Sequence, residues 1–233
     1  MKQLVSPVLT TVAVLLLTVS CDYFNLDKLL EQNPTKSRME GVWQVTEAYN
    51  EDGESILDSI SIPIVLFHLT SDNSVESTAG PMITYIVYGG SKYTSIASKI
   101  DQIFNYASLG LNGGEWTIDG GQATRFTLEM KLQGIAGQRT LTDLLGWLGI
   151  GSDYLDVVVY HKFNDIKVTF EDWNDTVMTW EFDDETKAVY NTKDKNLNYV
   201  LWNGWPTDSF SRCKFVLTKR SKDIEDLVKE ATE

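Results

Sequence analysis

Few side chains in this sequence have the types and spacing needed for metal, nucleophilic or acid–base chemistry. The 233 residues include two Cys and two His, and His68 and His161 lie far apart with no second His at metal-ligand spacing. These counts exclude a Cys/His zinc site and a disulfide scaffold. Cys213 shares the alternation of Phe215 and Leu217, which predicts a small buried side chain and not a catalytic thiol. We therefore expect no metal, no cofactor and no enzymatic activity.

Acidic residues are numerous but form no catalytic pattern. Asp and Glu number 33 against 20 Lys and Arg, and the net charge of −13 argues against nucleic acid as a partner. Residues 172–183 echo a calcium loop, but Val177 replaces the turn glycine and Asp183 replaces the bidentate Glu. Paired carboxylates could serve a glycosidase, although so many acids produce pairs by chance. An envelope hydrolase is therefore the third hypothesis.

The amino-terminal segment indicates export and lipidation. After Met1-Lys2, an uncharged and mostly apolar run extends from Leu4 to Val19 and ends at Ser20-Cys21. A short apolar run between a Lys and a small residue is typical of a secretory signal peptide. The segment resembles the lipobox of bacterial lipoproteins, with Thr18 where Leu is usual. This resemblance implies cleavage before Cys21 and its acylation, with chains such as palmitate that hold the protein on a membrane. An ordinary secretory peptide or an uncleaved anchor is the alternative.

The domain layout follows from that assignment. We expect a lipoprotein signal peptide at 1–20, a lipidated Cys and polar tether at 21–40, and one domain at 41–233. We expect a monomer in the bacterial cell envelope, anchored in the outer rather than the inner membrane. Asp22 after Cys21 favours inner-membrane retention under the sorting rule of one bacterial group, so the choice of membrane stays open.

Alternation of apolar and polar residues dominates the rest of the chain. In Thr124–Leu132, Phe126, Leu128 and Met130 share one face, and the turn at Asp119–Gly121 predicts a hairpin with the preceding strand. The other predicted strands are Val42–Tyr49, Ile62–Thr70, Met82–Tyr88, Glu115–Ile118, Val157–His161, Asp165–Asp172, Thr176–Asp183 and Ser211–Lys219. About ten strands joined mostly by short turns predict a mainly β protein, an antiparallel meander closed into a barrel or sandwich.

Three segments have helical spacing instead. Ser91–Ala107 and Thr140–Leu148 are predicted as short helices inserted between strands, and Ser221–Ala231 as a C-terminal helix capped by Ser221.

Both ends of the predicted β region carry motif residues. Gly41-Val42-Trp43 opens the first strand, and Lys219 and Arg220 end the last one. This arrangement resembles the Gly-x-Trp signature of lipocalins and the wider calycin group, and in particular the lipocalin-like domains of envelope lipoproteins. The resemblance implies a β-barrel whose base is plugged by Trp43, with Lys219 or Arg220 packed across the indole as a cation–π pair.

The aromatic residues supply the remaining functional candidates. The side chains of Phe126, Met130, Phe170 and Trp180 share the inward parity of their strands, and either form the wall of a ligand cavity or interdigitate as a packed core. Trp202 and Trp205 flank an Asn-Gly turn, where an exposed aromatic could stack on a sugar ring. The leading hypothesis is a membrane-anchored lipocalin-like lipoprotein that binds a small apolar or amphipathic ligand. The alternative is a surface carbohydrate- or protein-binding β-sandwich that uses the loop aromatics.

Overall fold

The computed structural model describes residues 34–61, 64–88, 112–118, 124–133, 158–171, 174–192 and 210–233. Cys21, Trp202, Trp205 and the predicted helices at Ser91–Ala107 and Thr140–Leu148 lie outside these residues. The strands are β1 (Gly41–Asn50), β2 (Leu66–Leu69), β3 (Ser74–Ser77), β4 (Asn112–Ile118), β5 (Arg125–Gln133), β6 (Val158–Phe170), β7 (Val177–Phe182), β8 (Lys187–Thr192) and β9 (Cys213–Arg220). The helices are α3 (Lys36–Met39), α4 (Leu57–Ile60), α5 (Gly80–Tyr88) and α9 (Ile224–Thr232).

Eight of the strands form a closed antiparallel barrel. Neighbouring strands pair in sequence order from β1 to β7, β7 pairs with β9, and β9 returns to β1. Closure places Trp43 opposite Lys219, so the two ends of the β region become neighbours. The predicted mainly β architecture is confirmed, and it is a barrel and not a sandwich. Such closure removes the exposed edges that an open sheet would leave.

The ninth strand joins the barrel at a branch. β6 pairs with β8 over its first half and with β7 over its second half, on the same edge. Between the two halves lies Asp165, whose φ of 61° is left-handed and so unusual for a non-glycine residue. The predicted strands Val157–His161 and Asp165–Asp172 are therefore one long strand with a local distortion.

The prediction of a strand at Met82–Tyr88 was wrong. This segment is α5, which begins at Gly80-Pro81, and proline is favoured in the first turn of a helix. Met82, Ile83, Ile86 and Val87 are all buried, which is the spacing of a helix face. A short, continuously apolar run does not show by itself which period it follows.

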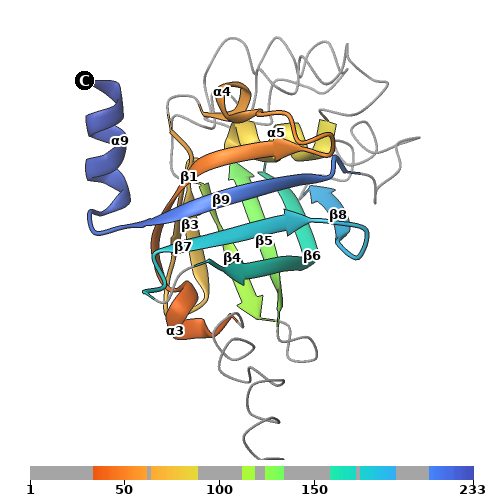
Figure 1. Ribbon diagram of the computed structural model, residues 1–233, viewed down its shortest axis with the longest axis horizontal. Coiled ribbons are helices and arrows are strands. Elements are labelled where there is room, and N and C mark those ends of the chain that lie inside the picture. The colour runs from red at the N-terminus through yellow and green to blue at the C-terminus, as the bar shows by residue number, and fades with distance from the viewer. Residues whose placement is uncertain are drawn as a thin grey trace, which may run out of the picture.

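The remaining helices lie at the ends and on the outside of the barrel. Figure 1 shows α3 at one end, α4 and α5 at the opposite end, and α9 beside the outer wall. The C-terminal helix begins later than predicted, because Asp223 and not Ser221 is its N-cap: the Asp223 carboxylate accepts a 2.8 Å hydrogen bond from the Asp226 amide. A charged cap at this position also interacts favourably with the helix dipole.

Aromatic side chains occupy the barrel interior. The ring of Trp180 lies 4.8 Å from that of Phe67 and 4.9 Å from that of Phe126, measured between centroids. Phe182 lies in edge-to-face contact with Phe163 at 5.2 Å and with Phe215 at 5.7 Å. Because these rings come from strands on different sides of the barrel, they join its walls through a single hydrophobic core.

Candidate functional site

One end of the barrel, which we call the base, is closed around Trp43. The indole Nε1 donates a 2.7 Å hydrogen bond to the Met39 carbonyl in α3, and Lys219 Nζ lies 5.1 Å from the ring centroid. Gly41 has a φ of 127°, and a Cβ at this position would lie 2.8 Å from the Lys219 Cε. Glycine is therefore favoured by the backbone conformation, and it leaves room for the Lys219 side chain.

A second cation completes the base. The Arg38 guanidinium lies 4.1 Å from the ring centroid of Phe170 and forms an ion pair with Asp175 at 2.6 Å. Phe170 in turn meets Trp43 edge to face, with 6.2 Å between centroids. Arg38 precedes the Gly-x-Trp motif, and sequence reasoning gave it no role, because its partner lies in a distant turn.

Arg220 takes a different position from Lys219. It is exposed on the outer wall, where its Nε donates a 2.8 Å hydrogen bond to Gln44 Oε1. Successive residues of a strand point to opposite faces, so only one of the two basic residues could lie over Trp43. That residue is Lys219.

The four candidate ligand-wall residues are all buried, but they lie at different levels of the barrel. Phe170 is at the base beside Trp43. Phe126 and Trp180 meet in the middle. Met130 pairs in register with His161, farther toward the α5 end. The structure therefore brings Phe126 and Trp180 together and separates Phe170 and Met130 from them along the barrel axis.

Three fully buried tryptophans differ in the surroundings of their indole nitrogens. Trp43 Nε1 donates to Met39 O, and Trp116 Nε1 donates to Thr70 O at 3.2 Å. Trp180 is 0% exposed, yet no acceptor lies within hydrogen-bond distance of its Nε1 among the residues that the structure describes. A buried donor without an acceptor costs about 1–3 kcal/mol. Trp180 Nε1 is therefore a polar atom inside the barrel that is available to a hydrogen-bond acceptor.

His161 is also buried inside the barrel, with its ring 5.5 Å from that of Tyr190 in an edge-to-face contact. Burial lowers the pKa of this imidazole to about 3, because charging it would require desolvating an imidazolium. His161 is therefore neutral at physiological pH. His68, by contrast, lies half-exposed on β2, with Nδ1 3.6 Å from a carboxylate oxygen of Glu76.

Cys213 is buried, as predicted from its alternation with Phe215. Burial raises the pKa of its thiol well above the ordinary range, so the nucleophilic thiolate is not populated at neutral pH.

A buried arginine holds the branch between β6, β7 and β8. Arg125 is 6% exposed and forms a bidentate ion pair with Asp183, with N–O distances of 2.8 and 3.0 Å. A carboxylate oxygen of Glu185 also lies 2.9 Å from the Arg125 guanidinium. Burial alone would raise the pKa of Asp183, but the hydrogen bonds and charge of Arg125 hold it below its usual value. Sequence reasoning missed this cluster, because it placed Arg125 on the polar face of its strand and Asp183 in a solvated turn.

Across the described part of the chain, no three His, Cys, Asp or Glu side chains converge on a position that could hold a metal ion. None of the helices among the described residues is long and apolar enough to cross a membrane.

No protein-family model matches the sequence, and no curated protein matches it. The geometry of the chain, an eight-stranded antiparallel barrel, is compatible with a lipocalin-like fold.

Proposed function

We propose that this protein is a membrane-anchored, lipocalin-like lipoprotein of the bacterial envelope that binds a small apolar or amphipathic ligand inside its barrel, without catalysis. The observation that carries the proposal is the Trp180 Nε1–H, a donor in the aromatic interior with no acceptor among the described residues. Binding sites for small molecules are largely apolar and contain a few polar groups that fix the ligand's orientation.

The chemistry of the ligand follows from the residues around Trp180 Nε1. A carbonyl, carboxylate or hydroxyl oxygen beside the indole would accept the hydrogen bond and remove a penalty of about 1–3 kcal/mol. The apolar part of the ligand would pack against rings such as Phe67 and Phe126, which already contact Trp180. A ligand has to part these rings to enter, so binding is coupled to side-chain rearrangement.

In this proposal, the tether between Cys21 and the base determines how the barrel is attached to the membrane. Twelve residues lie between Cys21 and Pro34, so these two positions are at most about 45 Å apart when the chain is fully extended. Pro34 leads directly into α3 at the base. A lipid on Cys21 would therefore tether the barrel to the membrane from its base end.

Native mass spectrometry of the full-length protein purified from its own host tests the proposal. We expect the wild type to retain a small molecule, and Trp180→Phe to retain much less of it. Trp116→Phe is the matched control, because its indole already has a partner and it should keep the ligand. A wild-type protein without added mass, or equal retention by both variants, would contradict the proposal.

The alternative of surface recognition depends on Trp202 and Trp205. Both lie outside the described residues, so it stays a prediction from the sequence.

A further inference from the structure

Arg220 ends β9 on the outer wall of the barrel, and the closure of the base does not use it. Its Nε is held by Gln44 Oε1 on β1. Neither of its η nitrogens has a partner among the described residues. The guanidinium is therefore oriented by one hydrogen bond and keeps the planar pair of donors that binds carboxylates and phosphates.

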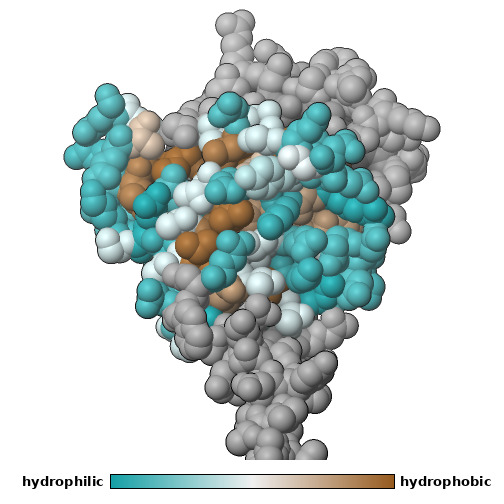
Figure 2. Space-filling view, in the orientation of Figure 1, coloured by the Kyte–Doolittle hydropathy of each residue, from teal (hydrophilic) through white to brown (hydrophobic). Residues whose placement is uncertain are grey.

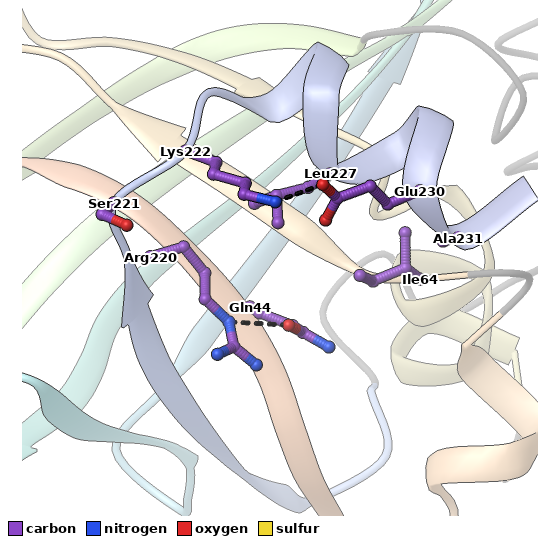
Figure 3. A pocket seen from close by; sticks show the side chains of 8 residues that line it. All are labelled: Gln44, Ile64, Arg220, Ser221, Lys222, Leu227, Glu230 and Ala231. Carbon is purple, nitrogen blue, oxygen red and sulfur yellow. Dashed lines mark hydrogen bonds and ion pairs between the residues drawn. The ribbon is translucent and has the colours of Figure 1, made fainter.

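This guanidinium lies in a groove between the barrel and α9. The groove has a volume of about 450 Å³, within the range of small-molecule sites. It is lined by Gln44, Ile64, Arg220, Ser221, Lys222, Leu227, Glu230 and Ala231. Figure 3 shows Arg220 extending along β1 to Gln44, with the Lys222 and Glu230 side chains meeting on the α9 side.

The charges in the groove do not cancel. Lys222 and Glu230 form an ion pair with each other, which leaves Arg220 as the uncompensated charge. Although the whole protein carries a net charge of −13, the charged side chains that line the groove sum to a net positive charge. A local positive charge favours an anionic ligand over a cationic one.

The other side of the groove is apolar. Ile64 lies before β2, and Leu227 and Ala231 lie one turn apart on α9. Figure 2 shows apolar residues gathered where α9 meets the barrel, while the outer face of α9 is hydrophilic. Leu227 is only partly buried and therefore leaves apolar surface in the groove.

We propose that this groove binds a small amphipathic oxyanion, namely a carboxylate or phosphate attached to a short apolar body. The oxyanion pairs with the Arg220 guanidinium, and the apolar body packs on Ile64 and Leu227. Such a group could come from a free metabolite or from the headgroup of an anionic lipid. This site is separate from the barrel interior and does not depend on a ligand there.

The test is a calorimetric titration of the full-length protein in dodecyl maltoside with hexyl phosphate. We expect hexyl phosphate to bind at least about tenfold more tightly than inorganic phosphate, which lacks the apolar body, or hexanol, which lacks the charge. Arg220→Gln should reduce the affinity about tenfold or more. Ala231→Trp, which fills the apolar side of the groove, should reduce it as well.

Two controls make the outcome specific. Arg212→Gln removes an exposed arginine that pairs with Glu51 and Asp184 away from the groove, and should leave the affinity unchanged. Unchanged affinity in Arg220→Gln would overturn the proposal. A loss in Trp180→Phe but not in Arg220→Gln would also overturn it, and would place hexyl phosphate in the barrel.

A second titration distinguishes the two sources of the oxyanion. If nanodiscs containing phosphatidylglycerol weaken hexyl phosphate binding relative to phosphatidylcholine nanodiscs, the groove takes an anionic lipid headgroup. If the affinity is the same in both, it takes a free amphiphile.

Discussion

At the scale of single residues, Trp43, Trp116 and Trp180 have the same side chain and nearly the same burial but different polar surroundings. Alternation along β7 predicts that Trp180 points inward, since every second residue of a strand faces the core. Whether its Nε1 finds an acceptor among the described residues depends on which atoms the other strands bring to the barrel centre. No sequence pattern contains that information. The same is true of the neutral state of His161.

The three tryptophans give a test by stability. Replacing each by Phe removes similar volume, but Trp43→Phe and Trp116→Phe also break a hydrogen bond to a backbone carbonyl. After Trp116→Phe the Thr70 carbonyl still accepts from the Asn73 amide. We expect each of these two variants to lose about 1 kcal/mol more than Trp180→Phe in urea unfolding of the ligand-free protein. Equal losses at all three positions would mean that Trp180 Nε1 has an acceptor in the folded state.

His161 makes the free energy of unfolding depend on pH. The pKa of its imidazole is about 3 in the folded state and near 6.5 in the unfolded state. Between about pH 3 and pH 6.5 the imidazole is therefore protonated mainly in the unfolded state. Stability is therefore complete above about pH 6.5 and falls as the pH drops toward 3, by up to about 1.4 kcal/mol per pH unit. Urea unfolding between pH 7 and 4.5 should show this slope, and His161→Phe should reduce it. An unchanged slope in the variant would assign the acid sensitivity to other groups.

At the scale of elements, strands with clear alternation were predicted near their observed places, as β1, β5, β7 and β9 show. β3 and β8 were missed. β3 has four residues, too few for a period to be evident. β8 forms because Arg125 and its carboxylates turn the chain back beside β6. These contacts join residues about 60 positions apart, so the local sequence pattern around β8 does not predict them.

The base joins four elements, α3, β1, β6 and β9, through Trp43. Because its ring is 0% exposed and contacts Phe170 and Lys219, Trp43→Ala should cost about 3–5 kcal/mol in denaturant unfolding. Lys219→Met keeps most of the packing and loses the cation–π contact, so it should cost only about 0.5–2 kcal/mol. A loss below about 1 kcal/mol for Trp43→Ala would show that the base does not hold the barrel together.

At the scale of the whole molecule, we propose that an acylated N-terminus tethers the base end of the barrel to the membrane. Both parts of this arrangement can be tested separately, because the anchor and the barrel lie in different stretches of the chain.

The anchor depends on one side chain. Cys21→Ser should abolish incorporation of a labelled fatty acid and shift the protein from the detergent phase to the aqueous phase, or leave it uncleaved, because the thiol receives the lipid in the family that the segment resembles. Wild-type protein is the positive control in the same labelling experiment. Equal labelling of Cys21→Ser would end the lipoprotein interpretation.

The central claim is that the barrel interior binds a small ligand beside Trp180, and displacement of an apolar fluorescent probe by fatty acids tests it most directly. We predict that the probe binds, that palmitate displaces it, and that Trp180→Phe weakens probe binding while Trp116→Phe does not. The absence of probe binding to the wild type, or equal probe affinity in both variants, would contradict the claim.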